Sequence, residues 1–284
     1  MKVFDSIGSV RSFLNDKRRQ GSQIGLVPTM GSLHKGHFNL IKLAAKNNNI
    51  VVVSIFVNPT QFNKKEDLQN YPRDLDKDIK ALENIGCQAV FVPSEREMYP
   101  SNRTLTFEVG YIGKIMEGKF RPGHFAGVAL IVTKLFNVIA PNYAYFGQKD
   151  LQQLVLIKNL VRELNFDLEI VEVPTVREAS GLAMSSRNQR LNGQEKNLAA
   201  NIYKGLQILK NKIVSGIGLE TSISETKEFY KNVEGFDLEY LEIVRKSDLL
   251  PISKFNSDIE TALCVAGYVA DVRLLDNLCI NPKV

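Results

Sequence analysis

"IGLVPTMGSLHKGHFNLIKLAAK", residues 24–46, joins a short apolar run to a helical pattern through a turn that contains glycine. The run "IGLVP" is typical of a buried strand, and "HFNLIKLAAK" has the apolar spacing of a helix. Similar strand-like runs follow at "IVVVSIFV" (50–57), "AVFVP" (89–93), "YAYFG" (143–147) and "LEIVEVP" (168–174), and helical segments separate them. This alternation predicts an α/β fold with a doubly wound parallel sheet covered on both faces.

The character of the sequence changes after residue 175. The segment "REASGLAMSSRNQRLNGQEK" (177–196) is polar and precedes helical sequence from Leu198, and the tail "TALCVAGYVADVRLLDNLCI" (261–280) has the pattern of two strands around Gly267. We therefore expect two domains, residues 1–175 and a smaller α+β domain of residues 176–284.

The composition is that of an ordinary globular protein, with 284 residues of which 44% are hydrophobic and 24% charged. No apolar run reaches membrane-spanning length and the first residues lack the apolar centre of a signal peptide, so we expect a cytoplasmic protein that binds no membrane. The three cysteines are scattered without disulfide or zinc spacing and are expected to be small buried hydrophobes. The net charge of +5 fits an anionic small substrate and does not demand nucleic acid.

The pair His34 and His37 could serve a metal or a phosphate group. Zinc needs at least three protein ligands, and the only other histidine, His124, is far away in the sequence. Backbone N–H groups at a helix that begins near His37, together with the helix dipole, form an anion site, and imidazoles can donate to phosphoryl oxygens. The loop also follows a strand of a parallel sheet, at the carboxyl end where ligands bind. We therefore prefer the phosphate interpretation.

The string "PTMGSLHKGH" (28–37) resembles the H-x-G-H signature of nucleotidyl-transferring Rossmann-like proteins, which include class I aminoacyl-tRNA synthetases. More particularly, it resembles the pantoate–beta-alanine ligase (pantothenate synthetase) family, and so do "FVNPTQF" (56–62), "RPGHFAGV" (121–128), "FGQKDLQQL" (146–154) and "VPTVREASGLAMSSRN" (173–188). The resemblance implies a Rossmann-like first domain, a homodimer, and MgATP as a substrate. It implies that pantoate attacks the α-phosphate to give pantoyl adenylate and pyrophosphate, and that β-alanine then displaces AMP to make pantothenate.

The resemblance also implies roles for the first motif and for the turn that follows the strand at 50–57. His34 and His37 would contact the ATP phosphates, with His37 as a proton donor. Gln61 would bind pantoate and β-alanine, while Asn58 would fix its loop. The nucleotide would also contact the residues around the histidines, Pro28, Thr29, Met30, Gly31 and Gly36, with Met30 also facing the substrate.

Two later motifs complete the expected site. Gly147 would allow close approach of a ligand, Lys149 would bind phosphate, Asp150 would accept from ribose hydroxyls, and Gln153 would bind pantoate together with Gln61. Catalytic groups Ser185, Ser186 and Arg187 would hold the leaving pyrophosphate, and Val176 and Met184 would line the adenine site. As isolated features, Lys149 could be a solvated charge, Asp150 a helix cap, and the serine segment an interdomain linker.

Two assignments stay open from the sequence. Arg121 and His124 precede a helix and could contact substrate or be structural. For Mg²⁺ there is no dense carboxylate cage, which agrees with a metal held mostly by phosphate oxygens and water, and Asp78 is the best protein ligand unless it is a surface acid.

Two other functions compete with this one. An adenylyltransferase would use the same histidine loop but would retain AMP in its product and would need a basic pocket for a phosphorylated acceptor. An RNA-binding module is supported only by the charge and the histidine motif, and it would bind in a strongly salt-dependent way.

Overall fold

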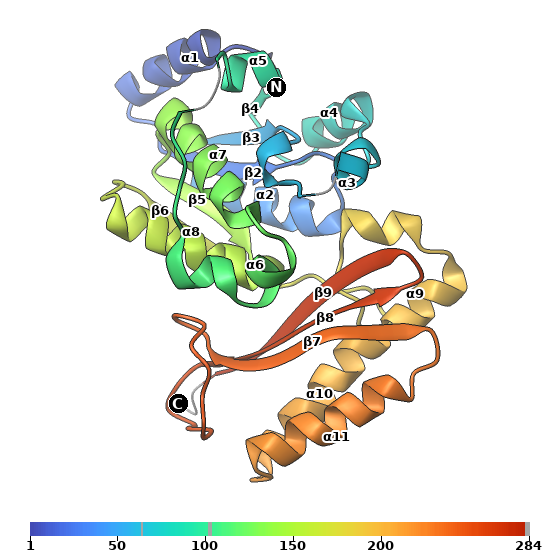
Figure 1. Ribbon diagram of the computed structural model, residues 1–284. Coiled ribbons are helices and arrows are strands. Elements are labelled where there is room, and N and C mark those ends of the chain that lie inside the picture. Colours follow the sequence, from blue (N-terminus) through green and yellow to red (C-terminus); the bar gives the residue numbers. More distant parts are fainter. Residues whose placement is uncertain (64, 102–103, 282–284) are drawn as a thin grey trace. The chain divides into compact units, whose positions relative to one another are not determined.

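The computed structural model describes residues 1–63, 65–101 and 104–281 (Figure 1). The chain divides into two compact units, of which the first contains Met1–Gln148 and Leu156–Pro174 and the second contains Lys149–Val155 and Thr175–Val284. The final passage of the chain from the first unit to the second falls between Pro174 and Thr175, one residue before the boundary expected after residue 175. The segment Lys149–Val155 groups with the second unit, although it lies within the range expected for the first domain.

The first unit is built on a six-stranded parallel sheet, in the order β1-β4-β3-β2-β5-β6. The strands are β1 (Lys2–Phe4), β2 (Ile24–Thr29), β3 (Ile50–Ile55), β4 (Ala89–Phe91), β5 (Tyr143–Gly147) and β6 (Glu169–Val173). All five strands predicted from apolar runs are present, whereas β1 is too short to be recognised from its pattern. The α/β prediction with a parallel sheet is confirmed.

Helices cover both faces of this sheet (Figure 1). Every residue of β3 is buried, as expected for a strand with helices on either side. On one face, α2 packs its Leu40, Ile41 and Ala44 against Val51 and other strand residues. The helices and 3₁₀ turns are α1 (Ile7–Arg19), α2 (Lys35–Asn47), η1 (Pro59–Gln61), α3 (Lys65–Gln69), α4 (Leu75–Glu83), α5 (Glu95–Met98), η2 (Gly110–Lys114), α6 (Met116–Phe120), α7 (His124–Ile139), η3 (Gln148–Asp150) and α8 (Leu151–Glu163).

The strand order places a topological switch point beside β2. The chain passes from β2 to β3 and β4 on one side, and β5 then pairs with β2 on the other side. In open parallel sheets, ligands bind at the carboxyl ends of the strands at such a point. The histidine turn that follows β2 and Gly147 at the end of β5 therefore lie where a ligand is expected.

The second unit packs helices on an antiparallel sheet in the order β7-β8-β9, which agrees with the expected α+β class. Its elements are η4 (Ser186–Arg190), α9 (Gly193–Ala199), α10 (Asn201–Val214), α11 (Leu219–Lys231), β7 (Phe236–Arg245), β8 (Thr261–Val269) and β9 (Val272–Ile280). Its core joins Leu206 and Leu209 of α10 to Leu263 and Val265 of β8, among other residues.

The two strands expected between residues 261 and 280 are present as β8 and β9, but Gly267 does not stand between them. Gly267 lies inside β8, paired with Leu238 and Leu274, and the chain reverses after Val269. A Cβ at Gly267 would come within 2.4 Å of the Phe236 ring, so this glycine is needed for packing and not for a turn.

Cys87 and Cys264 are buried, as the sequence predicts, whereas Cys279 is only half-buried. Within the described residues, none of the helices has the length and apolar character needed to span a membrane.

Candidate active site

The two histidines that follow β2 cap the helix that carries them. α2 begins at Lys35, two residues before the expected start, and His34 is its N-cap. The His34 ring Nδ1 accepts the Gly36 N–H at 3.1 Å, and the His37 ring Nδ1 accepts the His34 N–H at 3.3 Å. The two rings lie 4.1 Å apart between centroids. Because both Nδ1 atoms accept from backbone amides, the neutral rings carry their proton on Nε2 and can donate it.

The turn before His34 has an unusual backbone. Gly31 and Ser32 both have positive φ, at 79° and 52°. The Thr29 hydroxyl donates to the Ser54 carbonyl at 2.8 Å and accepts the Gly31 N–H at 3.2 Å. The turn is thus held at its start by a neighbouring strand, and the left-handed conformation of Ser32 requires further support.

Asp78 on α4 supplies that support. Its Oδ2 accepts the Ser32 N–H at 2.7 Å and its Oδ1 accepts the Leu33 N–H at 2.8 Å. The residue is only 3% exposed, so the alternative that Asp78 is a surface acid is wrong. Burial raises the pKa of this carboxyl, while the two amide hydrogen bonds act in the opposite direction.

A buried polar network surrounds Gln61 in the η1 turn. The Asn58 amide donates to the Gln61 side chain at 3.2 Å and to the Gly127 carbonyl at 3.1 Å, and its oxygen accepts the Tyr99 hydroxyl at 2.8 Å. The Gln61 amide nitrogen lies 2.8 Å from the Met30 sulfur. The contacts of Asn58 thus tie the loop to α7, and Gln61 lies beside Met30.

His124 is the first residue of α7 and is 7% exposed. Its Nδ1 lies 2.8 Å from the Gln61 carbonyl and its Nε2 lies 3.3 Å from the Arg121 guanidinium. Since a carbonyl only accepts and a guanidinium only donates, the ring is neutral with its proton on Nδ1. Arg121 also lies 3.8 Å from Glu117. These contacts favour the structural alternative for His124.

The segment after β5 carries the next group of predicted residues. A Cβ at Gly147 would meet nothing within 4 Å, so the backbone is open to solvent on this side. The Lys149 ammonium lies 3.7 Å from the exposed Asp150 carboxylate, and the Lys149 carbonyl accepts from the Asn277 side chain at 2.8 Å. Gln153 is half-buried in the first turn of α8.

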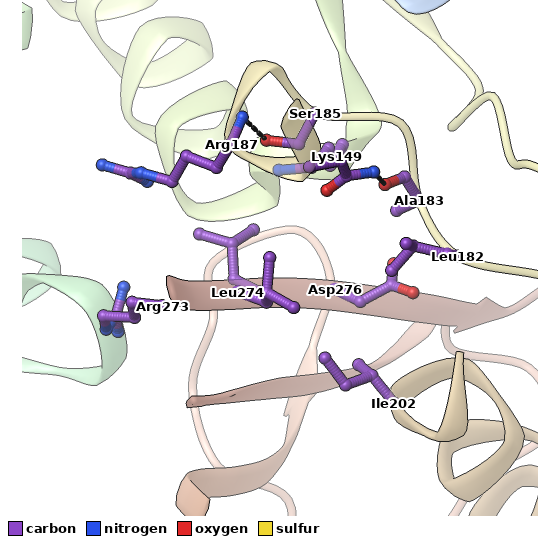
Figure 2. Close-up of a pocket in the computed structure, with 11 residues that line it drawn as sticks. Lys149, Leu182, Ala183, Ser185, Arg187, Ile202, Arg273, Leu274 and Asp276 are labelled. Atoms are coloured by element: carbon purple, nitrogen blue, oxygen red, sulfur yellow. Dashed lines mark hydrogen bonds between the residues drawn. The ribbon is translucent and has the colours of Figure 1, made fainter. Parts of the chain in front are cut away.

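The serine motif forms a hairpin-like loop followed by a tight turn. The Met184 N–H donates to the Val176 carbonyl at 2.9 Å, which brings together the two residues expected at the adenine site. Ser185 caps η4 by accepting the Arg187 N–H at 3.3 Å, and Figure 2 shows the Arg187 side chain extending from this turn. Ser186 is 7% exposed.

A small pocket in the second unit is lined by three cationic side chains and one carboxylate (Figure 2). Its lining brings predicted residues together with residues of β9 and α10: Lys149, Leu182, Ala183, Ser185, Arg187, Asn188, Ile202, Arg273, Leu274, Leu275 and Asp276. Arg273 was not predicted, and its guanidinium is paired with Glu239.

Arg177 and Asp276 form a buried ion pair that the sequence analysis missed. Arg177 donates to both carboxylate oxygens, at 2.5 and 3.0 Å, and stacks on Tyr203 at 3.7 Å. Burial raises the pKa of the Asp276 carboxyl, and Arg177 counteracts that rise. Arg177 stands within a recognised motif, but Asp276 lies in the tail, so only the fold brings the two together.

The predicted residues form two sets. The first unit holds the histidine turn, Met30, Asn58 and Gln61, and the second unit holds Lys149 and the Ser185–Arg187 turn. Over the described parts of the chain, no three His, Cys, Asp or Glu side chains group as metal ligands would.

Comparison with known proteins gives one consistent result. A family model described as pantoate-beta-alanine ligase matches residues 2–279. A pantothenate synthetase from Cytophaga hutchinsonii is 45% identical over 276 residues, covering 97% of this chain and 98% of the relative. The crystal structure of pantothenate synthetase from Thermus thermophilus has a TM-score of 0.92 at 39% identity and covers 99% of this chain and 100% of its own. A pantoate-beta-alanine ligase from Francisella tularensis, complexed with beta-gamma ATP and beta-alanine, has a TM-score of 0.81 at 39% identity and covers 98% of this chain and 97% of its own.

Proposed function

The chain belongs to the pantoate–beta-alanine ligase family, and we propose that it condenses pantoate with β-alanine at the expense of ATP. The pantoate carboxylate attacks the α-phosphorus of ATP, and the bond to the pyrophosphate breaks to leave pantoyl adenylate. The amine of β-alanine then attacks the acyl carbon, and AMP leaves as pantothenate forms. The enzyme is therefore an AMP-forming acid–amine ligase.

His34 and His37 act in the first step. Negative charge develops on the departing pyrophosphate, and hydrogen-bond donors placed against it stabilise the transition state. The tautomers set by the backbone amides leave an N–H donor at Nε2 of each ring. This arrangement of two imidazoles at the start of α2 is the observation that carries the proposal.

Gln61 positions the organic substrates as a neutral donor and acceptor. A cation bound tightly to the pantoate carboxylate would reduce its nucleophilicity, whereas an amide orients it without that cost. Gln61 is 7% exposed and its side chain is held by Asn58 and Met30, so it presents a fixed surface. Gln153 is the second pantoate-binding residue in this proposal, and Arg121 acts through His124 on the turn that carries Gln61.

In the second unit, Lys149, Ser185, Ser186 and Arg187 bind the phosphates and the leaving pyrophosphate. Lys149, Ser185 and Arg187 line one small pocket, so these three side chains lie near one another, which supports this assignment. Val176 and Met184 contact the adenine, Asp150 the ribose, and Gly147 permits close approach. Mg²⁺, held by phosphate oxygens and water, would supply charge neutralisation of the triphosphate. Asp78 is not included as its ligand because both carboxylate oxygens accept backbone amides.

The proposal is tested by incubating the purified protein with ATP, Mg²⁺, pantoate and β-alanine and omitting one component at a time. Pyrophosphate should form with ATP, Mg²⁺ and pantoate alone in a single turnover, and steady AMP release should require β-alanine as well. AMP formation that does not depend on both organic substrates would contradict the assignment. An adenylyltransferase would instead retain AMP in a dinucleotide product.

A cytoplasmic location and a homodimer remain predictions from the sequence. Size-exclusion chromatography with light scattering tests the second prediction, and a monomer at micromolar concentration would contradict it.

A further inference from the structure

We propose that Asp78 is a positioning residue, whose buried carboxylate fixes the turn that carries His34 and His37 by binding the amides of Ser32 and Leu33. The inference deepens the proposed function and rests on it, because it concerns the two imidazoles assigned to the ATP phosphates. It gives Asp78 a role in the first chemical step that is separate from metal binding.

The geometry of the contact fixes both position and orientation. Asp78 lies on α4, 46 residues from Ser32 in the sequence, so the contact ties two distant segments together. Each carboxylate oxygen accepts one of two successive N–H groups, at 2.7 and 2.8 Å. Hydrogen bonds to an ionised acceptor are shorter and stronger than neutral ones, and two of them at separate oxygens also prevent rotation of the bound peptide.

The backbone of the turn favours a negative charge at the position of the Asp78 carboxylate. Gly31 and Ser32 both have left-handed φ values, a conformation that costs energy for serine. Successive amides in such a turn point to one side and form a concavity that binds anions. A Cβ on Gly31 would lie 3.0 Å from the Asp78 Oδ2, so glycine at this position also allows the carboxylate to approach.

The position of the turn determines the position of both rings. Leu33, whose amide binds the carboxylate, directly precedes His34, the N-cap of α2. The His37 ring accepts the next amide along the chain, that of His34. A shift of the turn therefore moves both imidazoles together, and a displacement of about 1 Å can cost about 10²-fold in rate.

The test compares Asp78→Asn with Asp76→Asn, which removes the same charge from an exposed position on the same helix. The NH₂ group of the asparagine would face the N–H group of Ser32 or Leu33, and two hydrogen-bond donors cannot pair with each other. We expect kcat for pantoate-dependent pyrophosphate release to fall about 10- to 100-fold in Asp78→Asn only, with the Mg²⁺ concentration for half-saturation unchanged.

An unchanged kcat in Asp78→Asn would overturn the proposal. A raised Mg²⁺ requirement with normal kcat at saturating Mg²⁺ would also overturn it and would identify a metal ligand. If the wild type and Asp76→Asn show no pantoate-dependent reaction, it is the proposed function that fails.

A spectroscopic measurement makes the result independent of activity. The chain has three histidines, so their ring signals can be resolved by NMR. We expect the signals of His34 and His37 to shift in Asp78→Asn while that of His124 does not, and no shift of the pair would contradict the inference. If Asp78→Asn does not fold, hydrogen exchange in the wild type decides. The Ser32 and Leu33 amides should exchange slowly with and without Mg²⁺, and fast exchange in either condition would overturn the proposal.

Discussion

The His37 imidazole performs two tasks on its two nitrogen atoms, and these can be separated by substitution. Nδ1 accepts the His34 amide and stabilises the start of α2, while Nε2 carries the proton proposed for the ATP phosphates. His37→Ala removes both functions. His37→Asn retains an acceptor at the position of Nδ1 and loses only the donor at Nε2.

We therefore predict that His37→Asn and His37→Ala lower kcat for pyrophosphate release by about 10²- to 10³-fold. Only His37→Ala should also lower the free energy of unfolding, by about 1 kcal/mol for the lost cap. Single-turnover kinetics at saturating MgATP and urea denaturation measure the two effects. Asn39→Ala, an exposed position on the same helix, is the control. Normal pyrophosphate release in His37→Asn would show that the ring is only a helix cap.

The sequence singles out candidate site residues where their chemistry stands within one motif, and their roles stay predictions. The histidine pair and Gln61 are examples, because a strand followed by a characteristic turn places them. The partners of these residues were not predictable. Tyr99 binds Asn58 from 41 positions away, and Asp276 binds Arg177 from 99 positions away. Such contacts depend on how distant elements pack, and no local pattern encodes them.

The Arg177–Asp276 pair attaches the 175–185 loop to β9. Asp276 is 4% exposed, so loss of its partner leaves a buried charge. We predict that Arg177→Met lowers the free energy of unfolding at pH 7 by about 3–5 kcal/mol. Arg190→Met, at an exposed position of η4, should change it little. Urea denaturation of both variants provides the measurement, and a similar small loss in both would refute a stabilising role for the pair.

The pH dependence of Arg177→Met gives a second check. Burial raises the pKa of the Asp276 carboxyl, while Arg177 and the nearby Lys149 lower it, so the pKa should rise further without the arginine. A carboxyl whose folded pKa lies above its unfolded value contributes stability at low pH that is lost as the pH rises through the folded pKa. The deficit of Arg177→Met relative to wild type should therefore be largest at neutral pH and shrink in acid. A deficit that grows as the pH falls would contradict this assignment.

The contact between α7 and η1 depends on one glycine. A Cβ at Gly127 would lie 2.3 Å from the Thr60 carbonyl and 2.7 Å from the Gln61 nitrogen, both backbone atoms that cannot rotate away. We predict that Gly127→Ala lowers the free energy of unfolding by about 1–3 kcal/mol and raises KM for pantoate, because the turn that carries Gln61 must move. Gly8→Ala, where the added methyl meets nothing within 4 Å, is the matched control. An unchanged KM would separate this contact from substrate binding.

The elements themselves were largely predictable, and the exceptions have physical causes. Buried strands such as β3 are continuous apolar runs that stand out in any sequence. β1 has three residues and no such run, so only its pairing with β4 reveals it. The sequence pattern placed Gly267 between two strands, but glycine serves equally inside a strand where a neighbouring ring, here Phe236, leaves no space for a side chain. Local composition cannot distinguish these two uses of glycine.

The division into two units gives a test of whether ATP engages both. Cys87 lies in the first unit and Cys264 in the second, and both are buried. Burial raises the pKa of the Cys87 thiol to about 11, so it should react with a thiol reagent only after its unit opens. The labelling rates of these two cysteines therefore report the opening of each unit separately, provided that the half-buried Cys279 is replaced by serine.

A ligand that binds a unit only before it opens slows labelling of the cysteine in that unit. The labelling rate falls by a factor of 1 + [L]/Kd, or about 100-fold when the ligand concentration is 100 times Kd. We predict that MgATP without pantoate slows labelling of both Cys87 and Cys264, because the proposed ATP contacts come from both units. The comparison requires that the units open independently, and Arg177→Met checks this condition, since it should accelerate labelling of Cys264 alone. If the units do open independently and MgATP protects only one cysteine, the residues of the other unit do not bind ATP. The assignment of either His34 and His37 or Lys149 and Arg187 to the nucleotide would then be wrong.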